Sequence, residues 1–212
     1  MARVLYIIAN PKSIESSVSH QVGQAFLKAY RENHANDEIQ EINLYEEEFP
    51  IVDLDVLNSW EKMRRKGIPF SELSQVEQQK INALNQFVDR VVVADKYVFV
   101  APMWNWSIPP RLKEFIDSIT VAGKTFHYEE NGPVGHLMGK KAIHIQVSGG
   151  IYSQGPLMKL DHSHPYLKQV LNIIGIHNVD VLYVEGHDFD RERADEIIRK
   201  GIADAVKHAM TF

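Results

Sequence analysis

The sequence predicts a doubly wound α/β domain with a five-stranded parallel sheet and helices on both faces. Five short apolar runs, rich in β-branched residues, alternate with longer segments in which apolar residues recur every three or four positions. Three of these runs end in polar, aromatic or glycine-rich loops, as parallel strands do at ligand sites. The 212 residues suffice for one such domain with a sizeable core, so we expect a single domain over residues 1–212.

The composition excludes several classes of function. A net charge of −5 gives no bias toward nucleic acids or anionic membranes, and no apolar run approaches the roughly 20 residues that span a bilayer. The apolar start, residues 3–9, is too short for a secretory signal. The absence of cysteine excludes disulfides, thiolate metal sites and cysteine nucleophiles. We therefore expect a cytoplasmic protein without nucleic-acid or membrane partners.

The first loop has the residues of an anion site. Residues 4–9 form an unbroken apolar run, typical of a central parallel strand, and a polar loop from Asn10 leads into a helix. Ser16, Ser17 and Ser19 lie near the start of that helix, where hydroxyls and free N–H groups bind anions. One serine that caps the helix is the simpler alternative, but three serines favour a phosphate. The loop has no glycine, so it is neither a Walker A loop nor a dinucleotide fingerprint.

Two further elements precede the third strand. Residues 37–44 alternate enough to form the second strand, whereas residues 51–70 have weak periodicity and suggest a long connection with one or two helical turns. Ser74 and Glu77 fit a capping box at the start of the next helix. The predicted buried stripe of this helix consists of Val76, Ile81, Leu84, Phe87, Val88 and Val91.

Two tryptophans occupy the loop after the third strand. The strand, residues 96–101, is a short apolar run, and the helix after the loop has Pro110 at its first position. Trp104 and Trp106 stand between prolines, which stiffen the loop, and Asn105 separates them. Packing against the core is the alternative for two large aromatic side chains. A stiff loop with aromatics and exposed amides favours the edge of a planar heteroaromatic ring.

Paired glycines mark the third loop. Residues 123–135 are predicted to form a short ribbon outside the sheet, and residues 140–147 form the fourth strand, with His144 as a core residue. In the loop that follows, Gly149 and Gly150 let the backbone approach a ligand closely with its N–H groups exposed. An ordinary glycine turn is the alternative.

The last part of the chain raises the question of a metal. Residues 161–164 contain two histidines and a carboxylate, but no further strong ligand lies nearby in the sequence, so no metal is expected. A helix that ends at Gly175, a fifth strand over residues 178–185 and a last helix capped by Asp190 complete the pattern.

Five strands without a sixth favour the flavodoxin-like strand order 2-1-3-4-5. In this order the loops after strands one and three face each other at the switch point, and the loop after strand four closes the third side. A phosphate site, an aromatic edge and a row of N–H groups suit FMN. Another phosphorylated ligand would also fit such an edge.

Four segments carry a resemblance that covers essentially the whole chain. They are residues 101–106, 122–133, 139–142 and 148–156. With them, the sequence resembles the FMN-dependent NADH-azoreductase family of flavodoxin-like NAD(P)H:quinone oxidoreductases. The resemblance implies that FMN is held by Asn10, Ser17, Val18, Ser19, Pro102, Met103, Trp104, Asn105, Trp106, Ser148, Gly149 and Gly150. At the positions of Asn10 and Ser148 the family often has serine and arginine.

The resemblance also implies an activity. NADH or NADPH would reduce the flavin, and a quinone or an azo compound would then accept two electrons in a ping-pong cycle. Phe126, Tyr128 and Tyr152 would line the acceptor slot beside the two tryptophans, and no side chain is expected to be an essential acid, base or nucleophile. The family implies a homodimer with the flavin near the interface. A flavodoxin-like electron carrier and a flavin-bound regulatory subunit are the alternatives.

Overall fold

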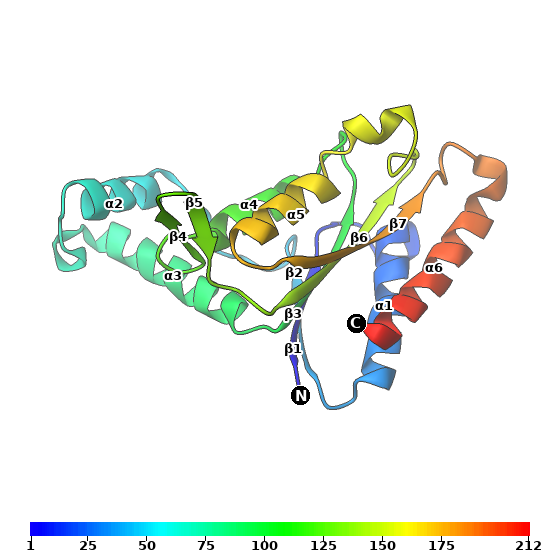
Figure 1. Ribbon diagram of the computed structural model, residues 1–212, viewed down its shortest axis with the longest axis horizontal. Coiled ribbons are helices and arrows are strands. Elements are labelled where there is room, and N and C mark those ends of the chain that lie inside the picture. Colours follow the sequence, from blue (N-terminus) through cyan, green and yellow to red (C-terminus); the bar gives the residue numbers. More distant parts are fainter.

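A parallel five-stranded sheet forms the centre of the molecule (Figure 1). The computed structural model describes residues 1–212. The strand order β2-β1-β3-β6-β7 is the predicted 2-1-3-4-5 once the strands of this sheet are counted along the chain. All neighbouring strands are parallel, so their carboxyl ends share one edge. The strands are β1 (Arg3–Ile8), β2 (Glu38–Asn43), β3 (Lys96–Pro102), β6 (Lys141–Ser148) and β7 (Asn178–Glu185).

Helices cover both faces of this sheet, as predicted. On one face lie α1 (Val18–Asn33) and α6 (Ala194–Thr211), and on the other α3 (Gln75–Val92), α4 (Pro110–Ile119) and α5 (His164–Ile173) (Figure 1). Neighbouring residues of β3 belong to different hydrophobic cores. Val98 packs in the core beneath α1 and α6, and Phe99 packs in the core on the opposite face of the sheet. Burial on both faces is why the strands read as continuous apolar runs. No helix combines the length and the apolarity needed to cross a membrane.

Three helix boundaries follow their sequence signals. Ser74 Oγ accepts from Glu77 N, and the Glu77 carboxylate accepts from Ser74 N, which completes the predicted capping box. Pro110 is the first residue of α4. Gly175 follows α5 in the left-handed region, with a φ of 103°.

The connection after β2 contains a full helix, α2 (Leu54–Arg65), where the sequence suggested only one or two turns. Asp53 caps α2 by accepting from Val56 N at 3.0 Å. Val56 belongs to a small separate core between α2 and α3. Leu54 and Leu57 are exposed on the outer side of α2, so apolar residues stand on both sides and blur the helical period.

Two smaller expectations are wrong. Val76 is 52 % exposed, because five residues before Ile81 it lies on the opposite side of a helix with 3.6 residues per turn. Asp190 caps a 3-10 turn immediately before α6 rather than α6 itself. The 3-10 turns of the chain are Ile14–Ser16, Phe70–Glu72, Pro156–Leu160 and Arg191–Arg193.

The predicted ribbon is a β-hairpin outside the main sheet. Its strands, β4 (Phe126–Glu129) and β5 (Gly132–Gly135), pair antiparallel. Leu137 N, just after the hairpin, donates to Ile174 O at the end of α5 at 2.9 Å. Since α5 starts at the carboxyl edge of the sheet and ends at the amino edge, the hairpin lies near the amino edge, beside α2 and α3 (Figure 1).

Candidate functional site

Three loops meet at the carboxyl edge of the sheet. The ends of β1 and β3 are joined by Ala9 N, which donates to Val100 O at 2.9 Å. The loop after β3 is joined to β6 by Met103 N, which donates to Val147 O at 2.8 Å. The strand order reverses between β1 and β3, and ligands of open α/β sheets bind at such a point.

Asn10, Ser17 and Ser19 form a buried polar cluster at the start of α1. Asn10 Nδ2 lies 2.9 Å from Ser17 Oγ and 3.0 Å from Ser19 Oγ, and the two hydroxyls are 3.0 Å apart. Ser17 also caps α1, because its Oγ accepts from His20 N at 3.2 Å. The first N–H groups of α1, beginning at Val18, have no helical partner. Hydroxyls and N–H groups thus gather in one place, as an anion site requires.

His20 is a member of this cluster that sequence reasoning missed. Its Nε2 lies 3.1 Å from the Asn10 carbonyl oxygen, which can only accept, so Nε2 carries the proton. Burial lowers the pKa of His20, which keeps the ring neutral. Its position three residues after the capping serine was the only sequence signal. Ser16, in contrast, is exposed and bonds to Ser13 outside the cluster.

The aromatic loop closes in a left-handed turn. Trp104 and Ser107 exchange backbone hydrogen bonds of 2.9 and 3.0 Å, and Asn105 and Trp106 between them have φ values of 46° and 63°. Two central residues at positive φ are typical of a type I′ turn, which asparagine adopts easily and tryptophan does not. Trp106 is 49 % exposed, and half-buried Trp104 lies 6.2 Å from the Tyr45 ring. Packing against the core therefore does not explain why a tryptophan side chain stands at position 106.

A cavity of about 540 Å³ lies beside this turn. His162 N donates to the Trp106 carbonyl oxygen at 2.9 Å, which ties the segment 161–164 to the turn. The Asp161 carboxylate accepts two N–H bonds from its own loop, so it anchors this segment. The cavity wall combines aromatic and polar groups: Trp104, Asn105, Ser107, Ile108, Pro110, Lys113, His162 and Tyr166.

The glycine loop is held by the last residue of β7 and by the loop that follows this strand. A Cβ at Gly149 would lie 2.3 Å from Asp188 Oδ2, and Asp188 N donates to Gly149 O at 3.1 Å. Glu185 holds the next part of the loop, because its carboxylate accepts from Tyr152 N at 3.0 Å. The missing side chain at Gly149 thus makes room for a neighbouring loop, a reason that the sequence did not reveal.

Within one chain, the residues expected to line the acceptor slot do not all come together. Tyr152 lies in the glycine loop at the carboxyl edge. Phe126 and Tyr128 lie on the hairpin near the amino edge, with ring centroids 5.3 Å apart. Phe126 is buried, whereas Tyr128 is 72 % exposed. These two side chains can therefore line a site at the carboxyl edge only from a second copy of the chain.

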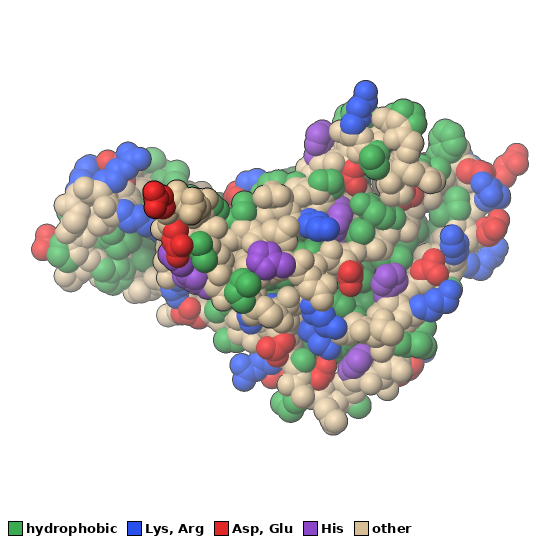
Figure 2. Space-filling view, in the orientation of Figure 1, with side chains coloured by type: hydrophobic (Ala, Val, Ile, Leu, Met, Phe, Trp, Pro, Cys, Tyr) green, Lys and Arg blue, Asp and Glu red, His purple; other side chains and the backbone are tan.

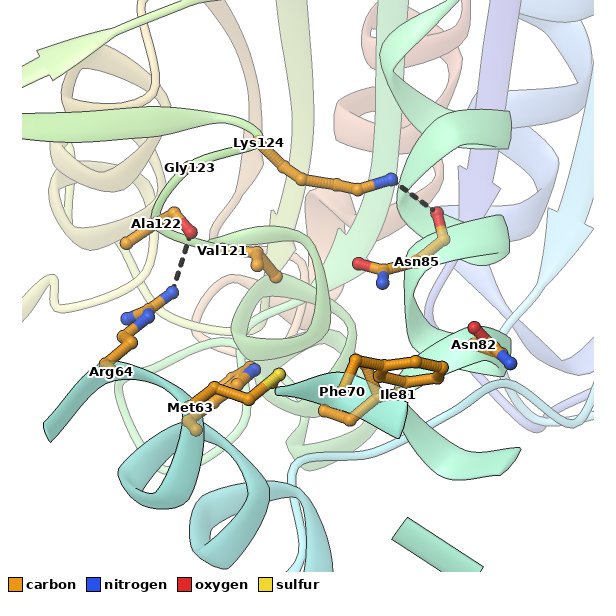
Figure 3. Close-up of a pocket in the computed structure, with 11 residues that line it drawn as sticks. Met63, Arg64, Phe70, Ile81, Asn82, Asn85, Val121, Ala122, Gly123 and Lys124 are labelled. Atoms are coloured by element: carbon orange, nitrogen blue, oxygen red, sulfur yellow. Dashed lines mark hydrogen bonds between the residues drawn. The ribbon is translucent and has the colours of Figure 1, made fainter. Parts of the chain in front are cut away.

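A second cavity, of about 550 Å³, lies between α2, α3 and the loop before the hairpin (Figure 3). Met63 is part of its apolar wall. Arg64 donates to the Ala122 carbonyl oxygen at 2.6 Å and Lys124 to the Asn85 carbonyl oxygen at 3.2 Å (Figure 3), and Lys124 also pairs with the Asp89 carboxylate, so both cations have partners. None of the predicted cofactor residues lines this cavity. The carboxyl edge is therefore the better candidate for a cofactor.

Known proteins resemble the chain over its whole length. A family model described as the flavodoxin-like fold matches residues 2–209. The FMN-dependent NADH:quinone oxidoreductase 3 of Halalkalibacterium halodurans is 47 % identical over 213 residues, and the FMN-dependent NADH:quinone oxidoreductase 2 of Bacillus subtilis is 44 % identical over 212 residues, each with 100 % of both chains covered.

Solved structures agree with these relatives. An azoreductase from Bacillus anthracis superposes with a TM-score of 0.91 at 36 % identity, with 100 % of both chains covered. An FMN-dependent NADH-azoreductase from Bacillus anthracis, solved in complex with FMN, gives a TM-score of 0.85 at 34 % identity, over 99 % of this chain and 100 % of the other. The resemblance read from the sequence is thus confirmed. The chain belongs to the flavodoxin-like family of FMN-dependent NADH:quinone oxidoreductases and azoreductases.

Proposed function

We propose that this protein is an FMN-dependent NADH:quinone oxidoreductase that also reduces azo compounds. The observation that carries the proposal is the carboxyl edge of the sheet, where a polar cluster, a left-handed aromatic turn and a glycine loop meet at the switch point. The names of the relatives, which include FMN, NADH and quinone, support the same function.

The residues at this edge fit the parts of FMN. The hydroxyls of Ser17 and Ser19 and the N–H groups at the start of α1 suit a phosphate, which the helix dipole also favours. The ring of Trp106, half-exposed in the aromatic turn, suits a planar ring system. We propose that the cofactor contacts are Asn10, Ser17, Val18, Ser19, Pro102, Met103, Trp104, Asn105, Trp106, Ser148, Gly149 and Gly150.

FMN, when bound, supplies the redox chemistry by taking a hydride from NADH or NADPH and passing two electrons to the acceptor. The chain itself binds and orients. Lys12 N donates to Asn10 Oδ1 at 3.1 Å and keeps the Asn10 side-chain amide directed at the two serines, while His20 donates to the backbone carbonyl oxygen of Asn10. Trp106 and Tyr152 offer flat faces to the nucleotide and to the acceptor in turn, which suits a ping-pong cycle.

We further propose that a second copy completes the site. Tyr128 is a large aromatic side chain left in water in the single chain, as is typical of interaction surfaces. In a homodimer, the hairpin of one copy would bring Tyr128 over the flavin of the other, with the buried Phe126 ring packed against Tyr128. A two-fold contact would do so for both sites at once.

Anaerobic reduction of the purified protein tests the function. We expect the visible absorption of bound flavin to bleach on addition of NADH and to return when a quinone is added after the nucleotide has been removed. Return of the colour without nucleotide would establish the ping-pong order. A protein that takes up no FMN would overturn the cofactor assignment, whereas bound FMN that NADH does not reduce would favour the electron carrier.

A further inference from the structure

Two histidines outside the flavin edge face each other on the hairpin. His127 and Glu129 are two residues apart on β4, so their side chains share one face. His136 follows β5 and lies diagonally opposite His127, within reach of its ring. His127 Nδ1 and His136 Nε2 are 2.8 Å apart. Figure 2 shows histidine and acidic side chains together at the place of this hairpin.

The outer nitrogen of each ring is held by an acceptor. His136 Nδ1 lies 2.8 Å from the Lys124 carbonyl oxygen, which can only accept, so this nitrogen carries a proton. His127 Nε2 lies 2.9 Å from a Glu129 carboxylate oxygen and carries a proton for the same reason. In a neutral imidazole the second nitrogen is then a bare lone pair. Two neutral rings would therefore direct two lone pairs at each other.

A metal ion of the kind that imidazole binds, placed between the rings, satisfies both lone pairs. Metal-bound histidines usually donate their outer N–H to a carboxylate or a backbone carbonyl, and both of these outer contacts are present here. We propose that His127 and His136 form a binding site for a divalent transition metal such as Zn²⁺.

A small movement opens the site to such an ion. Two nitrogens bound to Zn²⁺ at about 2.0–2.1 Å in tetrahedral geometry stand roughly 3.3 Å apart, so the rings must separate by roughly 0.5 Å. The side chains of His127 and Glu129 are 46 % and 60 % exposed, which gives the ion access and leaves the other coordination positions to water. The Lys124 ammonium is turned away to Asp89 on α3, so it does not repel the ion from that side.

Zinc titration of the full-length, tag-free protein tests the proposal. Calorimetry should show one saturable site per chain. His127→Gln and His136→Gln should each abolish the site. Glu129→Gln keeps both ligands and should weaken zinc binding by about 10- to 100-fold, because the outer contact orients the ring.

His208→Gln is the matched control, because His208 lies on α6, which covers the opposite face of the sheet from the hairpin. This variant should bind zinc like the wild type. Wild-type protein without saturable zinc binding would overturn the proposal, as would binding that survives His136→Gln unchanged. The three hairpin side chains are solvent-exposed, so their substitutions should leave the thermal unfolding midpoint of the chain close to that of the wild type.

Discussion

His144 is a buried residue whose two ring nitrogens both lack a hydrogen-bond partner. It is fully buried on β6, and its ring stacks on His164 with 5.7 Å between centroids. Burial, with a smaller effect of His164, lowers the pKa of His144 to about 3. Its apolar neighbours in the sequence predicted its place in the core. The lack of partners was not predictable, because it depends on side chains that α5 brings from far along the chain.

His144 should make the fold less stable in acid. In the unfolded chain it takes up a proton below its ordinary pKa of 6.5, whereas in the fold it does so only near pH 3. The unfolded state therefore binds more protons between these two values, and the free energy of unfolding falls as the pH falls through this window. Between pH 7 and pH 5 the loss from this residue is about 2 kcal/mol.

Urea unfolding at both pH values measures this effect. His144→Leu should lose that part of the pH dependence, because the residue that takes up the proton is gone. His177→Gln, an exposed control, should keep it. Equal pH dependence in His144→Leu and the wild type would show that His144 is already protonated or already solvated in the fold.

Ser17 caps α1 and is also a proposed phosphate ligand. Binding of two flavins, one with and one without a phosphate, distinguishes these two roles. Ser17→Ala removes the cap of α1 and should cost about 1 kcal/mol of stability. It also removes a hydroxyl from the proposed phosphate site, so FMN should bind more weakly while riboflavin, which has no phosphate, should change little. Ser16→Ala is the matched control, since Ser16 bonds only to Ser13. Fluorescence titration with each flavin measures this, and equal losses for the two flavins would place the phosphate elsewhere.

At the scale of elements, the sequence could predict those helices and strands that are stabilised by residues close together in the chain. The strands β3, β6 and β7 were predictable to within one residue, because apolar residues on both faces mark them locally. The helix α2 was not, because exposed Leu54 and Leu57 blur its apolar pattern and its buried residues pack against α3, which is distant in the sequence. The positions of the three loops were predictable because each loop begins where a predicted strand ends. The bond from His162 N to the Trp106 carbonyl oxygen and the contact between Gly149 and Asp188 arise only when distant segments meet.

In the turn from Trp104 to Ser107, we expect Trp106 to cost backbone strain and to contribute to activity. Glycine adopts the φ of 63° at position 106 easily, so Trp106→Gly should relieve about 1 kcal/mol of backbone strain. The same change removes the exposed ring, so kcat/KM for a quinone should fall several-fold. Thermal unfolding and steady-state kinetics together measure the two effects, with Ser107→Ala as a control that keeps both rings. Full activity of Trp106→Gly would show that this ring does not serve the reaction.

At the scale of the whole molecule, one chain presents two parts of the proposed site at opposite edges of its sheet. The cofactor loops lie at the carboxyl edge, and Tyr128 lies on the hairpin near the amino edge. The fold and the kind of site were predictable, because motif spacing and strand order reside in one chain. Assembly depends on a second copy. If that copy contributes Tyr128, Tyr128→Ala should lower quinone turnover several-fold and leave FMN affinity unchanged, and equal turnover would remove the hairpin from the site.

The place where FMN binds is the central claim, and titration of the flavin-free protein with FMN tests it most directly. Two variants distinguish the two cavities of similar size. The Asn10 side-chain amide donates hydrogen bonds to the hydroxyls of Ser17 and Ser19 at the carboxyl edge. Trp60, in contrast, lines the second cavity between α2 and α3. We predict that Asn10→Ala weakens FMN binding about tenfold and that Trp60→Ala leaves it unchanged. Binding that is lost in Trp60→Ala and kept in Asn10→Ala would contradict the claim and move the cofactor to the second cavity.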